Sequence, residues 1–220
     1  VDDNKLFSIP CAVDNAFFTE QNFFYSTDMD NLKNDLKINK ENMVIIFAAR
    51  FTKRKRPLDL LRSLINIDYS KITILFVGDG PERKSMESFA KKHNISAIFT
   101  GFQSQLEISS YYKISDLDIV ISDYDPSPKA LNEAMNFELP AIVTNVVGTA
   151  YDLIKEGKNG YIVNVGDCKE ISEKIDYLNN NRLELKKMGK ESYNIIQKWN
   201  YQEDVKGILK AVNHVVNDRI

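Results

Sequence analysis

Two acidic side chains eight residues apart form the clearest chemical pattern in this chain. Asp125 and Glu133 bound the segment Asp-Pro-Ser-Pro-Lys-Ala-Leu-Asn-Glu, which directly follows an apolar run over residues 117–122. Ser127 can cap a helix and Pro128 can occupy its first turn, so we expect a strand to run straight into a helix amino terminus. Such a terminus attracts phosphate, and spare carboxylates accept hydrogen bonds from hydroxyls. The segment therefore predicts a site for a phosphorylated sugar.

A basic segment supplies the complementary charge. Arg50 and Lys55 lie in Ala49-Arg-Phe-Thr-Lys-Arg-Lys55, just after another apolar run. Two fixed cations at that place would neutralise a diphosphate and stabilise a departing nucleotide. The alternative is a solvated basic turn. We expect that alternative to hold for Lys53, Arg54 and Arg56, which we interpret as surface charges.

Apolar runs of strand length alternate with amphipathic stretches of helix length along the chain. The pattern predicts six strands, at 43–49, 72–77, 97–100, 117–122, 141–144 and 161–163. Between them it predicts helices at 57–67, 81–93, 105–114, 128–137 and 151–155. Three further helices are expected, over about 166–178, 182–197 and 201–216, because apolar residues recur there at helical spacing.

This alternation indicates the fold class. The strand segments are nearly continuous Val, Ile, Leu and Phe, which is typical of parallel strands covered on both faces. We therefore predict an α/β fold: a doubly wound parallel sheet of about six strands, helices on both faces and a helical carboxyl-terminal tail. Ligands of such sheets bind at the carboxyl ends of the strands, where both chemical segments should lie.

Composition excludes several classes of protein. The chain of 220 residues has 29 Lys and Arg against 31 Asp and Glu, a net charge of -2, so we expect no nucleic-acid partner. Its two cysteines, Cys11 and Cys168, are far apart and lack a metal-ligand spacing, which favours a reducing compartment. No apolar run approaches 18 residues and the first five residues lack a signal-peptide core. We expect a soluble, cytoplasmic protein without a spanning segment.

The sequence gives no reason to expect a bound metal or another cofactor. Three Asp-x-Asp spacings begin at Asp28, Asp116 and Asp123, but Asp is frequent enough to produce them by chance. We interpret the pair Asp116 and Asp118 as shaping the turn that opens a strand. The two histidines, His93 and His214, stand alone on predicted helices.

Several short motifs occur in a defined order along the chain. They are Ile9-Pro-Cys-Ala-Val-Asp-Asn-Ala-Phe, the Ala49 to Lys55 loop, Val77-Gly-Asp-Gly-Pro-Glu82, Phe99-Thr-Gly-Phe102, Asp125 to Met135, Val146-Val-Gly-Thr149 and Gly157-Lys-Asn-Gly160. In this order they resemble the carboxyl-terminal, donor-binding domain of a family 4 retaining glycosyltransferase. That family has the GT-B architecture of two Rossmann-like domains. The resemblance implies a Rossmann-like sheet here and a nucleotide-diphosphate sugar as donor.

The resemblance also implies roles for the two acids. The first acid of the family motif contacts hydroxyls of the donor sugar, which assigns that role to Asp125. The second binds the ribose hydroxyls of the nucleotide, which assigns that role to Glu133. Asp125 is one methylene shorter than the family's glutamate, and this difference would select a different sugar. Taken without the family, an acid at a helix start is equally well a cap or a partner of the helix dipole.

Other loop residues receive roles by the same resemblance. Phe102 or Gln103 would meet the nucleotide base. The amides of Lys129 and Ala130, the Lys129 side chain and Ser127 would contact phosphate, because Pro128 removes one backbone donor. Gly148 and Thr149 stand near the donor phosphate.

We divide the chain into three parts on this basis. Residues 1–40 form an interdomain linker and entry segment, 41–200 a nucleotide-sugar-binding Rossmann-like domain, and 201–220 a helix that packs toward an absent amino-terminal domain with part of its apolar stripe exposed. That absent domain would hold an acceptor glycan or glycolipid. We therefore expect a fragment that turns over poorly alone. Family-level analogy points to polysaccharide or glycolipid assembly, with peripheral association at the inner membrane face.

Two other functions remain open. One is a non-catalytic module that binds a nucleotide sugar. The other is a dinucleotide-binding oxidoreductase domain, which is disfavoured because the first strand is not followed by Gly-x-Gly-x-x-Gly; the stretch from Ala49 to Arg54 contains no glycine.

Overall fold

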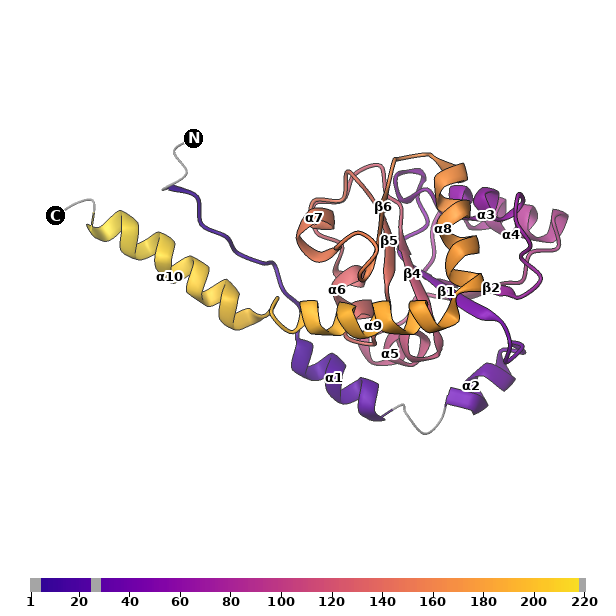
Figure 1. Ribbon diagram of the computed structural model, residues 1–220, viewed down its shortest axis with the longest axis horizontal. Coiled ribbons are helices and arrows are strands. Elements are labelled where there is room, and N and C mark those ends of the chain that lie inside the picture. The colour runs from indigo at the N-terminus through magenta and orange to yellow at the C-terminus, as the bar shows by residue number, and fades with distance from the viewer. Residues whose placement is uncertain (1–4, 25–28, 218–220) are drawn as a thin grey trace.

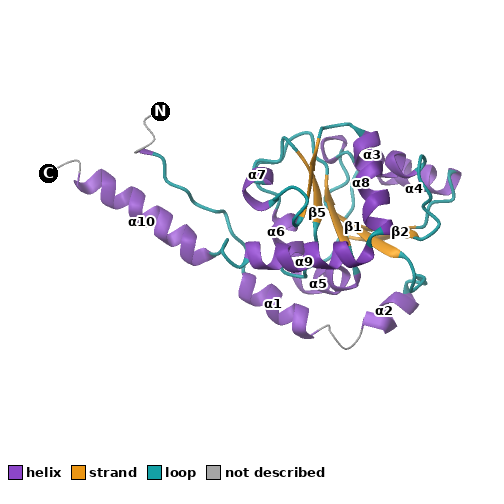
Figure 2. Ribbon diagram, in the orientation of Figure 1, coloured by secondary structure: helices purple, strands orange, loops and turns teal. Residues whose placement is uncertain are grey.

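A single parallel sheet lies between two layers of helices in the computed structural model, which describes residues 5–24 and 29–217 (Figures 1 and 2). The six strands are β1 (Met43–Ala48), β2 (Ile72–Val77), β3 (Ala97–Gly101), β4 (Leu117–Val120), β5 (Ala141–Thr144) and β6 (Gly160–Val163). All neighbours pair in parallel, in the order β3-β2-β1-β4-β5-β6. The predicted sheet and all six predicted strands are confirmed.

The order of the strands places a switch point between β1 and β4. The chain builds outward from β1 to β3 on one side, then returns to add β4, β5 and β6 on the other. Loops that leave β1 and β4 therefore diverge toward opposite faces and open a crevice at the carboxyl edge, where doubly wound sheets bind their ligands. The loops that hold Arg50 and Asp125 follow these two strands.

Helices cover both faces of the sheet. One apolar core lies between the sheet and α3 (Pro57–Leu64), α4 (Arg83–Lys92) and α8 (Cys168–Asn180). On the other face two cores involve α1 (Asn15–Phe24), α5 (Gln105–Ile114), α6 (Lys129–Met135) and α7 (Ala150–Leu153). The helix α9 (Arg182–Ile196) contributes Met188 to the first core and Ile196 to the last. This arrangement is the predicted doubly wound architecture.

The entry segment contains two helices that the sequence analysis did not predict, α1 and α2 (Met29–Asp35). The sequence analysis treated residues 1–40 as a linker and entry segment and placed no helix there. The Asp14 side chain accepts a hydrogen bond from the Phe17 amide (3.0 Å), which caps α1, and Phe18 is buried against Phe137. Burial of an aromatic ring against the domain thus decides the local structure. Residues 1–4, 25–28, which include Asp28, and 218–220 lie outside the described residues.

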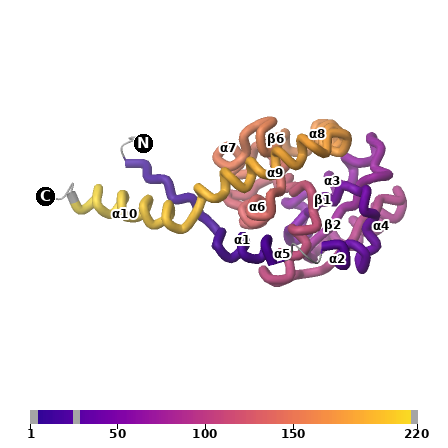
Figure 3. The backbone as a smooth tube through the Cα atoms, turned by 60° about the horizontal axis from the view of Figure 1, so that its bottom comes forward, coloured from indigo at the N-terminus to yellow at the C-terminus, as the bar shows by residue number. Residues whose placement is uncertain are grey.

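The last helix, α10 (Tyr201–Asn217), extends away from the sheet with the segment after residue 5 alongside it (Figures 1 and 3). Asp204 accepts hydrogen bonds from the amides of Cys11 (2.9 Å) and Ala12 (3.1 Å). A Cβ atom on Gly207 would lie 2.1 Å from the Ser8 carbonyl oxygen, so helix and segment are in direct contact. The expected apolar stripe is about half exposed, at Val205, Ile208, Leu209, Val212 and Val216. No helix in the described part of the chain has the length and apolar character needed to cross a bilayer.

Candidate functional site

A groove of about 450 Å³ opens at the carboxyl edge of the sheet, beside the switch point. We call it the edge groove; its lining residues are Ala48, Ala49, Arg50, Gly78, Asp79, Phe102, Gln103, Ile108, Tyr112, Ala130 and Glu133. Its volume is within the usual range for small-molecule sites. Five residues predicted for the site, from the loop after β1, the loop after β3 and helix α6, therefore line one groove: Arg50, Phe102, Gln103, Ala130 and Glu133.

A smaller recess of about 80 Å³ adjoins the edge groove. It shares Ala48, Ala49 and Ala130 with the groove and is also lined by Lys55, Ser122 and Lys129. The recess lies under the amino terminus of α6, whose unpaired N–H groups favour an anion. The second predicted cation, Lys55, is thus at the same edge of the sheet as Arg50.

Glu133 is the most buried acid that lines the edge groove. Its side chain lies on α6 and accepts a hydrogen bond at Oε2 from the Tyr112 hydroxyl (3.0 Å). Burial raises the pKa of Glu133, and the Tyr112 hydrogen bond and the Lys129 charge oppose that rise. Among the described residues no hydrogen bond is made to Oε1 of Glu133, so this oxygen can accept hydroxyls of a ligand.

The contact between Tyr112 and Glu133 was not predicted from the sequence. Tyr112 is fully buried on α5, and burial together with the Glu133 charge raises its pKa well above the usual range, so it remains a hydrogen-bond donor. In the sequence Tyr112 is only one apolar position of an amphipathic helix. No local signal relates it to an acid 21 residues later.

Lys55 and Asp125 form a hydrogen-bonded ion pair. Both side chains are largely buried, with exposed fractions of 19% and 10%. The Asp125 carbonyl accepts a hydrogen bond from the Gly148 amide (2.8 Å), which brings a third predicted loop to the same place. A Cβ atom on Gly148 would lie 2.3 Å from the Pro126 carbonyl oxygen, so this close approach requires glycine.

The basic turn is fixed by residues that were expected to be free surface charges. Arg56 pairs with Asp59 and Asp123, and Arg54 donates to the Tyr124 carbonyl (2.5 Å). Lys53 and Arg54 are exposed, as expected for surface charges, whereas Arg56 is partly buried. The short helix η3 (Lys53–Lys55) is thereby tied to the loop of Asp125, which positions Lys55. The contacts with Asp123 and Tyr124 join residues 67 and 70 positions apart, and no local pattern in the sequence indicates them.

Two details of the predicted phosphate contact differ in the structure. Ser127 does not cap α6; Pro128 takes the cap position and the helix begins at Lys129. The Ser127 hydroxyl oxygen is buried without a partner among the described residues, and so is that of Thr149. The Lys129 ammonium donates to Cys11 Sγ (3.1 Å) and to the Ala12 carbonyl (3.0 Å). Its side chain is therefore turned toward the entry segment, and it lowers the pKa of the Cys11 thiol.

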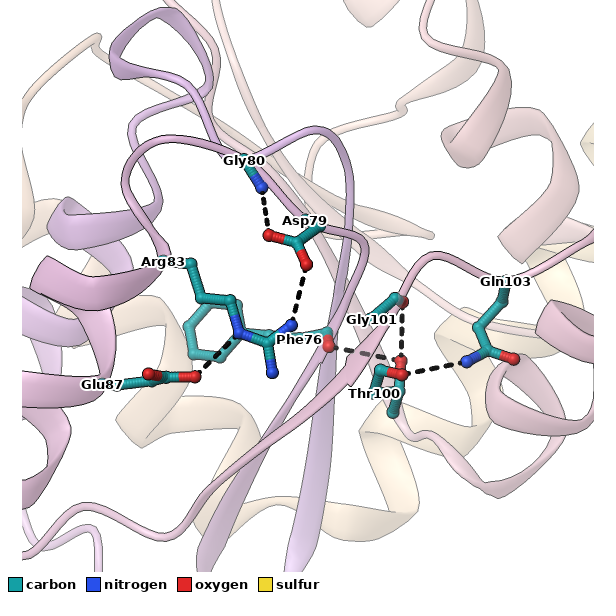
Figure 4. Close-up of polar contacts among 8 residues, drawn as sticks. All are labelled: Phe76, Asp79, Gly80, Arg83, Glu87, Thr100, Gly101 and Gln103. Atoms are coloured by element: carbon teal, nitrogen blue, oxygen red, sulfur yellow. Dashed lines mark hydrogen bonds and ion pairs between the residues drawn. The ribbon is translucent and has the colours of Figure 1, made fainter.

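The loops after β2 and β3 are held by their own polar contacts (Figure 4). Asp79 accepts hydrogen bonds from the Gly80 amide (2.7 Å) and from Arg83 (2.9 Å), and Gln103 donates to the Thr100 carbonyl (3.0 Å). Phe102 is 85% exposed, so it is not a core residue. Its ring is available to stack on a flat ligand at the groove.

Asp118 is a buried acid near this site. The sequence analysis interpreted it, together with Asp116, as shaping a turn. Asp118 on β4 is fully buried, and neither of its carboxylate oxygens has a hydrogen-bond partner among the described side chains and backbone groups. Burial raises its pKa to about 8, and the charge of Glu133 adds to the rise. Asp118 is therefore neutral at pH 7 and shapes no turn. Asp116 does act locally, accepting a hydrogen bond from the Val44 amide (2.8 Å).

A family profile described as "Glycosyl transferases group 1" matches residues 28–195, about three quarters of the chain. The chain belongs to this family. Among curated proteins, N-acetyl-alpha-D-glucosaminyl L-malate synthase of Bacillus anthracis is 28% identical over 159 residues, which cover 71% of this chain and 41% of that protein. The chain thus spans about two fifths of that relative.

Solved structures show the same fold. The carboxyl-terminal domain of a glycosyl transferase group 1 family protein from Francisella tularensis superposes with a TM-score of 0.68 at 24% identity, covering 79% of this chain and 93% of that one. The HepE protein of Anabaena, solved in complex with UDP-glucose, gives a TM-score of 0.76 at 19% identity, covering 86% and 53%. The expected resemblance of this group 1 glycosyltransferase domain to the carboxyl-terminal domain of GT-B enzymes is confirmed.

No group of three or more His, Cys, Asp or Glu side chains in the described ranges is arranged to hold a metal ion. The cationic side chains that line the edge groove and the recess of this group 1 domain are those of Arg50, Lys55 and Lys129.

Proposed function

We propose that this domain binds the nucleotide-diphosphate sugar donor of a retaining glycosyltransferase in the edge groove. The observation that carries the proposal is the convergence of Arg50, Lys55, Asp125 and Glu133 at one carboxyl edge, beside the switch point. Cations and carboxylates at this place match a ligand that is anionic at its phosphates and hydroxylated on both sides of them. The binding of UDP-glucose by HepE supports the choice of ligand.

Each residue has a distinct role in this proposal. Arg50 and Lys55 stabilise the charge that develops on the departing diphosphate, which lowers the barrier to transfer. Glu133, held by Tyr112, accepts hydrogen bonds from the ribose hydroxyls. Asp125 contacts sugar hydroxyls, and its ion pair with Lys55 holds its side chain beside the phosphates. Phe102 stacks on the base.

The remaining parts of the enzyme follow from the same assignment. An acceptor glycan or glycolipid would be held by an amino-terminal domain that contacts α10 and the entry segment. The half-exposed apolar positions of α10 fit that contact. Such an enzyme would act in the cytoplasm, in polysaccharide or glycolipid assembly at the inner face of the membrane.

A calorimetric screen tests the proposal. Uridine and guanosine diphosphates, their sugars and nicotinamide dinucleotide are titrated into the protein and into Glu133→Ala. One nucleoside diphosphate should bind, and its affinity should fall about tenfold or more in the variant, because hydrogen bonds to a carboxylate contribute about 1.5–3 kcal/mol. Glu173→Ala, which removes an exposed acid of α8, serves as the control and should not change the affinity. Equal binding by Glu133→Ala, or competition by nicotinamide dinucleotide, would reject the proposal.

A further inference from the structure

A second groove, of about 600 Å³, lies at the opposite, amino-terminal edge of the sheet. We call it the basal groove. Its walls include the residues that precede β1, β4 and β5, and the first half of α9. It shares no lining residue with the edge groove or the recess, so it is a separate feature of the domain.

The basal groove is basic in a chain whose net charge is -2. Its lining includes six cations, Lys33, Lys40, Lys113, Arg182, Lys186 and Lys190, against the acids Glu41, Asp116 and Glu138. This leaves an excess of three positive charges. In the described part of the chain, Lys40 is the only one of the six that joins an ion pair, with Asp30 (3.5 Å). The three acids of the groove therefore offset only part of its positive charge.

Three of the cations form a stripe along α9. Arg182, Lys186 and Lys190 follow one another at intervals of four residues, so they share one side of the helix over about 12 Å. Like charges at this spacing repel, and a cation at the first residue of a helix opposes the helix dipole. The neighbouring acid Glu184 lies near Lys187 instead (3.7 Å). The stripe is therefore costly for the helix unless an anion occupies the groove.

Two of the cations are partly buried and are held only by neutral oxygens. Lys113 donates to the Asn22 side-chain oxygen (2.5 Å), and Arg182 donates to carbonyl and amide oxygens of Asn179 (3.0 and 2.9 Å). Desolvation lowers the pKa of both groups. The charges of Glu138, for Lys113, and of Asp116 and Glu41, for Arg182, oppose this lowering without reversing it, so a bound anion would stabilise both partly desolvated cations further.

We infer that the basal groove is an anion-binding site for a ligand with two or more phosphate groups, independent of the donor site. The spacing of the stripe suits separated phosphates better than a single carboxylate, and an arginine fork matches phosphate oxygens. A concave groove of this size holds a small anion or a lipid head group. The net negative charge of the chain opposes a long nucleic acid. The phosphates belong either to a soluble polyphosphorylated compound or to anionic lipids.

Inorganic tripolyphosphate is the probe for the soluble source. It is titrated calorimetrically into the unmodified protein, into Lys186→Glu with Lys190→Glu, and into Lys187→Glu. Lys187 lies on the same helix but does not line the groove, which makes it a matched control. All three lysines are exposed, so the substitutions should leave the fold intact. We expect binding that weakens at least tenfold in the double variant and is unchanged in the control.

Vesicles of phosphatidylcholine with and without phosphatidylglycerol test the lipid source in a sedimentation assay with the same three proteins. Binding of either probe that is lost in the double variant supports the site, and the probe that binds identifies the source. The inference is overturned if neither probe binds, or if charge reversal at 186 and 190 leaves binding unchanged. It is also overturned if uridine diphosphate displaces tripolyphosphate, since the anion would then occupy the edge groove.

Discussion

Glu133 combines burial with an open hydrogen-bonding oxygen, and Tyr112 holds it in place. Replacement of Tyr112 by phenylalanine removes one hydroxyl and leaves the ring in the core. We expect donor affinity to fall about tenfold in Tyr112→Phe, because the carboxylate loses its orienting donor and about 1 kcal/mol or more of binding free energy. Calorimetry with the nucleoside diphosphate that binds measures the change. Tyr111→Phe, one residue away and only half-buried, should behave like the unmodified protein. Equal affinity for Tyr112→Phe would show that Glu133 is positioned without it.

Asp118 makes stability depend on pH in a defined direction. Its pKa is about 8 in the folded protein and 3.8 in the absence of the fold, so the folded state binds a proton that the unfolded chain has lost. The free energy of unfolding should therefore fall as pH rises from about 4 to 8, by at most about 1.4 kcal/mol per pH unit. In Asp118→Asn, the free energy of unfolding measured with urea should change less with pH over this range. In Asp116→Asn the unfolding free energy should still fall with pH as in the unmodified protein. An equally steep fall in Asp118→Asn would contradict the role of Asp118.

Individual residues also show where sequence reasoning reaches its limit. Arg50, Phe102 and Glu133 could be placed at the carboxyl edge of the sheet from the sequence. Arg50 and Phe102 directly follow predicted strands, and Glu133 lies in the helix after the next such loop. Tyr112 and Asp118 could not be recognised, because their importance arises from burial against side chains of other elements. The orientation of Lys129 was equally hidden. Its contacts with Cys11 and Ala12 depend on where the entry segment packs.

Among the elements, the turn around η3 shows how a loop is positioned by charge. Arg56→Ala removes the ion pairs with Asp59 and Asp123; Asp59 keeps Arg62 as a second cation, whereas Asp123 loses its partner. We expect a loss of about 1–3 kcal/mol in unfolding free energy and weaker nucleotide binding, since Lys55 would be fixed less firmly. Lys53→Ala changes an exposed lysine of the same turn and should do neither. Thermal unfolding and calorimetry compare the two variants. A neutral Arg56→Ala would mean that the contacts of Arg54 with Tyr124 and of Lys55 with Asp125 are enough to position Lys55.

The strands and most helices were predictable for a physical reason. A doubly wound sheet buries both faces of its strands, so each strand is a short apolar run that stands out from its flanking helices. The helix α1 was missed because the burial of its ring Phe18 depends on contact with Phe137, far away in the sequence.

For the whole molecule, the half-exposed apolar side of α10 is the surface on which the proposed amino-terminal domain would pack. In the isolated chain we expect this side to bind an apolar fluorescent dye, because Ile208 and Val212 are 48% and 50% exposed. Ile208→Ser with Val212→Ser should reduce dye binding and leave nucleotide affinity unchanged, since α10 lies away from the edge groove. A monodisperse protein that binds no dye would contradict the expectation. Transfer activity that appears only when an amino-terminal half is supplied would separate an enzyme from a binding module.

A crystal structure of the protein with the nucleoside diphosphate that binds in the calorimetric screen would show whether the edge groove holds a nucleotide-diphosphate sugar between its cations and Glu133. We expect the diphosphate beside Arg50 and Lys55, and a ribose hydroxyl within hydrogen-bond distance of the Glu133 carboxylate. A nucleotide bound at any other place, with the edge groove left to solvent, would contradict this expectation.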